Sequence, residues 1–288
     1  MRANYDDIVM ISVLGEVRAP PMSRSPFRVG ADGSLLVGPG PGGVVYNVRV
    51  GDRAIGWAAD HVEPGVSLQH SDSAANDSLN ILACVGNEAR VVSGEAKGKQ
   101  GTVTGKHGGI EHVLVDFDEE TLDELIPGDK VLVKAYGRGL KLLDHPEIKL
   151  LSISVQLLQA LPLSADDDGT LVVPVVGSAP AYLMGSGLGS PADRGDYDIQ
   201  TADRATLDEL GLADLRLGDL VALPDADHSY GRGYRKGAVT IAVVAHCDSI
   251  VAGHGPGVTS LLTSATGKIR LETDPEANIA RYLKLREE

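Results

Sequence analysis

Short apolar runs separated by glycine-rich turns dominate the chain and predict a fold built mainly from β-strands. The most apolar run, Val239–Ala245, is continuous rather than alternating, so it predicts a strand buried on both faces. Helical patterns are few: Ser71–Cys84, Asp118–Leu125, and Asp274–Leu285 with Asp274-Pro275 as its cap. Residues 146–163 fit neither period. Further strands are expected at Ile8–Leu14, Val44–Val50, Ala89–Ser93, Gly101–Thr104, Val113–Phe117, Lys130–Ala135, Leu171–Val176 and Lys268–Leu271.

This pattern predicts an α+β fold that is predominantly β, with a glycine-rich barrel or sandwich architecture and few short helices. We expect a β segment with one helix at 1–86, a small barrel module at 87–143, and a β-rich domain with a terminal helix at 144–288. The sequence Thr-Leu-Asp-Glu-Leu occurs at 121–125 and 206–210, each time before a Gly-Asp turn and a strand. A common way of entering a strand explains this echo better than a duplicated unit, although both interpretations stay open.

Composition narrows the class of protein. The 288 residues include 35 glycines but only 2 Phe and 1 Trp, so the core must be aliphatic. The net charge of −14 disfavours nucleic acid as a partner, because such a surface repels phosphates. Two cysteines in different contexts suit a reducing cytoplasm. No run reaches the length of a membrane helix, so we expect a cytoplasmic protein without membrane contact.

Histidines and aspartates follow two predicted strands near the C-terminus. His228 follows the strand ending at Leu223, and His246 and Asp248 follow Val239–Ala245, on one side of an extended chain. His254 lies between glycines. If the two strands are neighbours, these four residues could hold a divalent Zn, Mn or Fe ion and leave a position for water. Alternatively, they hydrogen-bond loop carbonyls and cap turns.

Two further segments are candidates for acid–base chemistry. His61 and Glu63 alternate onto one face, as a carboxylate orienting an imidazole would. Across a Gly-Gly turn, Lys106 or His107 could face Glu111 or His112. A charge pair at an exposed strand edge explains the first segment as well, and a solvated hairpin tip explains the second.

A substrate could be held by an arginine-rich loop near the N-terminus. Arg24 and Arg28, together with Tyr46 and Asn47, could bind a carboxylate or phosphate, or could simply balance local acidic charge. Tyr230, beside His228, is a further candidate for substrate binding. Gly38–Gly43 lacks the Lys-Ser/Thr of a Walker motif, so no nucleotide cofactor is expected.

Several segments resemble known families. Residues 89–103, ARVVSGEAKGKQGTV, look like the KOW motif of small SH3-like barrels, which often contact RNA or protein. Four motifs resemble a prokaryotic family of hypothetical proteins with a domain of unknown function: His61-Val-Glu-Pro-Gly65, Gly105-Lys-His-Gly-Gly109, Asp225-Ala-Asp-His228 and Gly253-His-Gly-Pro-Gly257. The Leu-x-x-Gly-Asp-x-Val turns look like those of acetamidase/formamidase-type proteins, which implies metal-assisted chemistry on amides.

Together these features predict a cytoplasmic enzyme, a metal-assisted hydrolase or lyase that acts on a C–N bond of a small polar amide or cyclic amide. The same histidines could also act without metal. The rival hypothesis is a non-catalytic module that binds RNA or a protein through the barrel. A homo-oligomeric scaffold is a third alternative.

Overall fold

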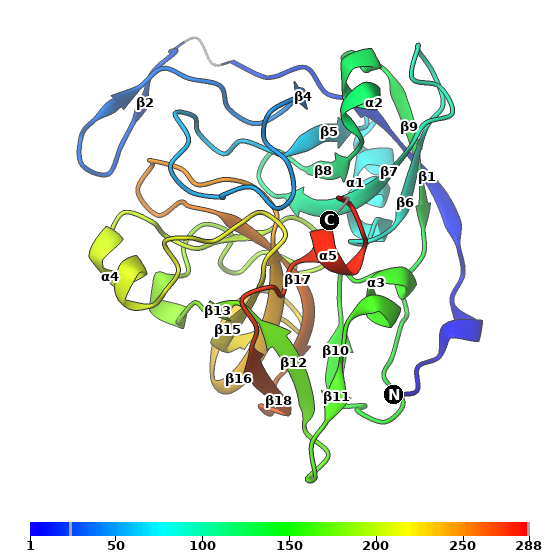
Figure 1. Ribbon diagram of the computed structural model, residues 1–288, viewed down its shortest axis with the longest axis vertical. Coiled ribbons are helices and arrows are strands. Elements are labelled where there is room, and N and C mark those ends of the chain that lie inside the picture. Colours follow the sequence, from blue (N-terminus) through cyan, green and yellow to red (C-terminus); the bar gives the residue numbers. More distant parts are fainter. Residues whose placement is uncertain (23–24, 287–288) are drawn as a thin grey trace.

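The computed structural model describes residues 1–22 and 25–286 and contains two β-rich halves that pack against each other (Figure 1). The predicted α+β, predominantly β class is confirmed. Arg24 lies outside the described residues.

The first half is a closed antiparallel barrel. Its strands are β1 (Ile11–Val17), β5 (Gly65–Gln69), β6 (Glu88–Val91), β7 (Gln100–His107), β8 (His112–Asp116) and β9 (Lys130–Ala135). They follow the order β1-β9-β6-β7-β8-β5, and β5 pairs back with β1 to close the sheet. The short β4 (Val44–Val45) pairs with β5. The segment 87–143 therefore supplies four barrel strands, and the region before it supplies the two that close the barrel.

The second half contains an open sheet whose central strands are buried on both faces. Its strands are β10 (Ile148–Leu150), β13 (Gly177–Ser178), β14 (Tyr197–Asp198), β15 (Leu220–Asp227), β16 (Gly233–Val244) and β17 (Gly257–Ser264). The order is β10-β17-β16-β15-β13, with β14 paired to β17. Ile241 and Val243 of β16 enter one apolar core, whereas Ala242 and Val244 enter the other. This arrangement confirms the two-sided burial expected from the unbroken apolar run.

Smaller elements cover the two halves. Strands β11 (Ser164–Ala165), β12 (Leu171–Val175) and β18 (Ile269–Thr273) form a third sheet, and β2 (Arg28–Val29) and β3 (Leu35–Leu36) form a hairpin. The α-helices in the described ranges are α1 (Ser73–Leu82), α2 (Glu119–Glu124), α3 (Val155–Ala160), α4 (Arg204–Glu209) and α5 (Ile279–Tyr282). Short 3-10 helices lie at Tyr5–Asp7 and Ala181–Leu183. None of these described helices has the length and apolar character needed to cross a bilayer.

Two predicted elements are shorter than the sequence indicated. The expected strand Val44–Val50 ends at Val45, because Val48 and Val50 leave the sheet to pack into the cores of the second half. The expected helix Asp274–Leu285 begins only after Asn278, whose side chain caps it. The ambiguous stretch 146–163 contains β10 followed by α3.

The two halves meet where β7 crosses β17. A Cβ atom at Gly105 would lie 2.5 Å from the Cβ of Ala245, so the backbones can approach this closely only because residue 105 has no side chain. The Thr259 hydroxyl accepts a hydrogen bond from the Lys106 amide at 3.0 Å and donates one to the Lys106 carbonyl at 3.3 Å. This contact places the end of β7 beside the end of β16.

Adding one methyl group at this crossing should destabilise the fold. We expect Gly105→Ala to lower the free energy of unfolding by about 1–3 kcal/mol, because the new Cβ overpacks against Ala245. Urea denaturation measures this difference. Gly233→Ala is the matched control, since its Cβ would meet only the Asp227 carbonyl oxygen, at 3.9 Å. Equal stability of the two variants would contradict the proposed close packing.

Candidate metal centre

His107 is oriented by a fully buried carboxylate. It ends β7 opposite His112, the first residue of β8. The Nδ1 atoms of His107 and His112 lie 2.6 and 2.9 Å from carboxylate oxygens of Glu63. The Gly42 amide and the Ser67 hydroxyl also donate to Glu63. Burial alone would raise the pKa of Glu63, but the charge of His112 and hydrogen bonds from both imidazoles hold it well below its usual range.

His246 follows β16 directly and is fully buried. Its Nδ1 lies 2.7 Å from the Cys247 carbonyl oxygen, and because a carbonyl can only accept, Nδ1 carries the proton. Its Nε2 lies 2.6 Å from Asp196 Oδ2. Burial lowers the pKa of His246, but the charge of Asp196 outweighs this effect and raises it to about 9. The Gly108 amide donates to the other oxygen of Asp196 at 2.6 Å, which ties the β7–β8 turn to this carboxylate.

His61 is held in an uncommon backbone conformation. Its φ of 54° lies in the left-handed region, and its amide donates to the Asp248 carbonyl at 3.0 Å. Its Nδ1 lies 3.1 Å from Asp60 Oδ2. Asp60 in turn accepts from the Ser249 hydroxyl and from the Arg28 guanidinium. Burial would raise the pKa of Asp60, yet hydrogen bonds from His61 and Ser249 lower it to about 2. Burial is also the main reason why the pKa of His61 is lowered.

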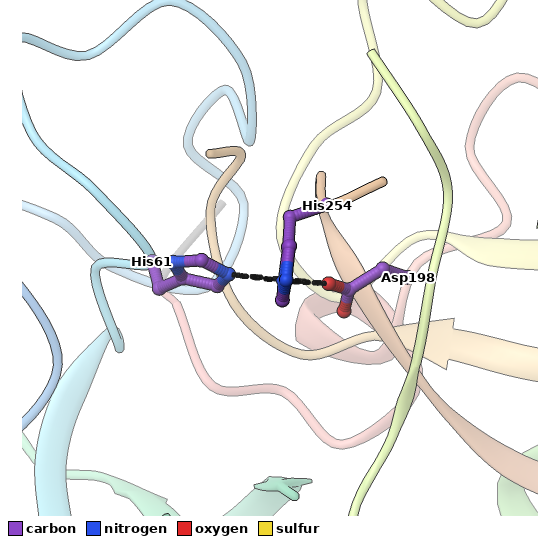
Figure 2. A group of neighbouring side chains, drawn as sticks. All are labelled: His61, Asp198 and His254. Atoms are coloured by element: carbon purple, nitrogen blue, oxygen red, sulfur yellow. Dashed lines mark hydrogen bonds and ion pairs between the residues drawn. The ribbon is translucent and has the colours of Figure 1, made fainter. Parts of the chain in front are cut away.

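His254 connects His61 to a second aspartate (Figure 2). Its Nδ1 lies 3.1 Å from His61 Nε2 and 3.0 Å from Asp198 Oδ2, so three potential ligand atoms surround one small volume. The hydrogen bond to Asp198 raises the pKa of His254. Asp198 also reaches toward the neighbouring group, because its Oδ1 lies 3.7 Å from His246 Nε2.

Two sets of ligand-type residues therefore lie side by side. One is His107, Asp196 and His246, and the other is His61, Asp198 and His254. The ligand atoms within each set lie within 4.8 Å of one another. The ring centroids of His107 and His246 are 4.1 Å apart, and those of His61 and His246 are 5.4 Å apart. Two imidazoles and a carboxylate in each set are a donor group that divalent metals bind.

The tautomers of three imidazoles fit metal binding. His61, His107 and His246 each direct Nδ1 to an acceptor behind the ring, namely Asp60, Glu63 or the Cys247 carbonyl. Nε2 is then the ring atom that can act as a ligand. In His246, whose pKa is raised to about 9, a bound cation would have to displace the proton on Nε2. Metal-binding histidines are oriented in this way by the acceptors behind them.

A glycine keeps the first set open. A Cβ atom at Gly257 would lie 1.8 Å from Asp196 Oδ2 and 2.1 Å from His246 Nε2. Any other residue at position 257 would displace the two ligand side chains.

Five of the six residues in the two sets line a pocket of about 260 Å³, and the sixth, His246, is fully buried. The pocket is lined by His61, His107, Gly108, Gly109, Glu111, Ser186, Gly187, Ser190, Pro191, Arg194, Gly195, Asp196, Asp198, Arg232 and His254. Its size suits a small polar molecule.

Four of the predicted site residues come together here: His61, His107, His246 and His254. Glu63 is close, but it supports His107 and His112 rather than His61. His246 and His254 lie in this cluster, but His228, from the segment that was expected to converge with theirs, does not.

The predicted ligands His228 and Asp248 belong to neither of the two sets found in the described chain. His228 extends from β15 toward β17, where its Nδ1 lies 2.7 Å from Ser260 Oγ. Asp248 accepts a hydrogen bond from the Gly56 amide, and its own carbonyl holds the His61 backbone.

The other predicted residues lie outside the pocket. Lys106 alternates with His107 on β7, so it points the other way and donates to Ser152 and the Asp193 carbonyl. Arg28 is bound to Asp60. Tyr46 and Asn47 line a separate apolar pocket, and Tyr230 is fully exposed.

The sequence interpretation missed Asp196 and Asp198, and it did not assign Arg232 or Glu111 to the site. One signal was present: Asp196 and Asp198 are two apart in an extended segment, as His246 and Asp248 are, so both face one side.

These features define a β protein with a histidine–aspartate cluster between its two halves, and the chain belongs to the family described as domain of unknown function DUF4438. The N-terminal family model matches residues 27–159, and the C-terminal model matches residues 160–283. Membership of a family of unknown function, predicted from the motifs, is confirmed. The chain is similar to a solved structure described as "Crystal structure of TM1086", with 50% identity, a TM-score of 0.93, and coverage of 98% of this chain and 99% of that one. No curated protein matches the chain.

His228 should make the protein sensitive to acid. Burial, and then the charge of Arg232, lower its pKa to about 3. The unfolded chain therefore takes up a proton near pH 6.5 that the folded chain resists. Stability is fully present above this pH and should fall as the pH drops toward 3, by up to about 1.4 kcal/mol per pH unit.

Chemical denaturation between pH 7 and 4 measures this slope. His228→Asn, which retains a polar atom near Ser260, should show a smaller slope than the wild type. His70→Asn, at a partly exposed ring, is the control. An unchanged slope in His228→Asn would show that this imidazole is not the group responsible.

Proposed function

We propose that this protein is a metal-dependent hydrolase with two adjacent divalent ions, one in each histidine–aspartate set. The observation that carries the proposal is the orientation of three imidazoles whose Nδ1 atoms are bound from behind. The Nε2 atoms of His61 and His246 lie against His254 and Asp196 within the cluster. Asp198, within reach of both His254 and His246, is the group that would link the two ions. Zinc, manganese and iron are the metals that suit imidazole and carboxylate ligands.

Metal ions at this position would lower the pKa of bound water and polarise a substrate carbonyl. These are the two requirements for cleaving an amide bond with water. The small polar pocket supports a substrate such as a small polar amide or cyclic amide. In such a reaction the water oxygen bonds to the carbonyl carbon, the C–N bond breaks, and a proton from the water goes to the departing nitrogen.

Glu111 is the residue that we assign to this proton transfer. It lines the pocket from the β7–β8 turn, and its Oε2 is buried with no hydrogen-bond partner in the described chain. Its φ of 58° is uncommon for a residue with a side chain. Asn76 and Asn80 donate to its carbonyl oxygen and fix the turn. A carboxylate oxygen that has no partner and lies in the lining of the pocket can accept a proton and pass it on.

The metal content of purified protein, loaded with Zn²⁺ or Mn²⁺ and desalted, tests the site. We expect about two ions per wild-type chain, about one in His246→Ala or His254→Ala, and almost none in the double variant, because each set loses a ligand. His228→Asn should retain about two ions, since His228 belongs to neither set. Elemental analysis measures these values. A wild-type chain that retains no ion, or variants that retain both, would rule out the proposed centre.

The activity is tested separately with Glu111→Gln. We expect kcat to fall by about 10²–10⁴-fold on whichever small amide or cyclic amide the wild type hydrolyses, because the proton carrier is lost. The metal content should stay at the wild-type value, since Glu111 belongs to neither set. Glu95→Gln, an exposed carboxylate of the barrel, is the control. Full activity in Glu111→Gln would exclude the assigned role.

A further inference from the structure

One arginine in the pocket is buried without an ionic partner among the residues that the structure describes. Arg232 lies in the turn between β15 and β16, is 2% exposed, and lines the pocket above the two ligand sets. Its Nη2 donates to the Arg194 carbonyl at 2.6 Å, whereas Nε has no hydrogen-bond partner in the described chain. A guanidinium stays charged and carries five N–H donors. The Arg232 side chain therefore retains N–H groups that can donate to a ligand.

The neighbouring carboxylates do not form ion pairs with Arg232. Burial lowers the pKa of Arg232, and the nearby charges of Asp196, Asp198 and Glu111 offset only part of this effect. Asp196 and Asp198 are engaged by His246 and His254 instead. A buried charge is costly unless an opposite charge or several hydrogen bonds compensate it.

Other arginines nearby are fully accounted for. Arg194, which also lines the pocket, pairs with Asp77 at 2.9 Å, and Arg235 on β16 pairs with Asp227 at 3.1 Å. Arg232 therefore differs from both in burial and in the absence of an ion pair within the described residues.

The backbone holds Arg232 firmly against the pocket wall. Its amide donates to the Ser190 carbonyl at 3.0 Å, and its carbonyl accepts from the Gly189 amide at 2.8 Å. Its guanidinium passes Gly195, where a Cβ would lie 3.8 Å from Nη2. The side chain is thus fixed before any ligand arrives, which reduces the entropy cost of binding.

We propose that Arg232 binds an anionic group of the substrate, a carboxylate or a phosphate, through its unused N–H donors. The planar guanidinium suits both groups, because each offers two oxygens to two parallel N–H bonds. This inference rests on the proposed function, because the bound anion is part of a substrate only if the protein is a hydrolase. It makes the substrate of the hydrolase an acidic amide rather than a neutral one.

The charges in the pocket agree with an acidic substrate. Asp196, Asp198 and Glu111 supply the carboxylates of the lining. Two divalent ions together with Arg232 would more than neutralise these three groups. The acidic surface of the chain would then surround a local positive site, and binding of an anion there would be favourable.

Isothermal titration with succinate and, separately, with inorganic phosphate tests the proposal on metal-loaded protein. Compared with the wild type, Arg232→Met should bind the preferred anion at least about tenfold more weakly, because hydrogen bonds to a charged group are lost. Arg232→Lys should show an intermediate affinity, because lysine keeps the positive charge but lacks the planar pair of parallel N–H donors. The comparison of the two anions identifies which group the site takes.

Arg235→Met is the matched control and should bind like the wild type, because its ion pair with Asp227 lies outside the pocket. Metal content is measured for every variant. If the wild type holds no metal, the proposed hydrolase fails, and the same titration on metal-free protein still decides the role of Arg232.

Equal affinity in Arg232→Met and wild type, or no anion binding by the wild type, would overturn the inference. A wild-type crystal soaked with the preferred anion gives a second measurement that does not depend on the folding of any variant. Density within hydrogen-bond distance of the Arg232 guanidinium is expected. Density bound at the ions alone, or an empty pocket, would also overturn it.

Discussion

The site depends on the close approach of two backbones at Gly105 and Ala245. At this crossing the Thr259 hydroxyl satisfies both the amide and the carbonyl of Lys106, as a neighbouring strand would. Because β7 is held here, the ring centroid of His107 lies 4.1 Å from that of His246, which belongs to the other half of the molecule. The barrel packs around one apolar core and the open sheet lies between two others, so no single core brings these rings together.

The polar groups at the crossing are ordered by acceptors that lie behind them. Asp60, Glu63 and the Cys247 carbonyl each hold one imidazole of the cluster, and Glu63 also holds His112. These acceptors are themselves hydrogen-bonded or part of the backbone. Such a network is stable in a buried place only when nearly every donor and acceptor is satisfied. Against this background, the unpartnered atoms of Glu111 and Arg232 stand out, because both lie on the pocket.

Much of the fold was predictable from sequence, because apolar runs and glycine turns report local structure directly. The four imidazoles of the cluster were also predictable as candidates, since each lies near backbone-demanding glycines. The partners of these residues could not be predicted from the sequence.

His228 follows a core strand as His246 does, but its position beside β17 turns it toward Ser260. Alternation along the strand alone did not show this. Asp196 and Asp198 lie in a glycine-rich loop where aspartates are common, so only the packing of β14 on β17 shows their role. The closure of the barrel by β1 and β5 is likewise a pairing over long sequence separation.

The two family models divide the chain at residues 159 and 160, and the cluster lies across that division. His61 and His107 come from the first part, whereas Asp196, Asp198, His246 and His254 come from the second. Neither part contains a complete set, so the two regions can only be inherited as one unit if the cluster is to persist. The cluster forms only when residues from both parts of the chain come together. An ion bound there would stabilise the state in which the two halves are joined over any state in which they are apart.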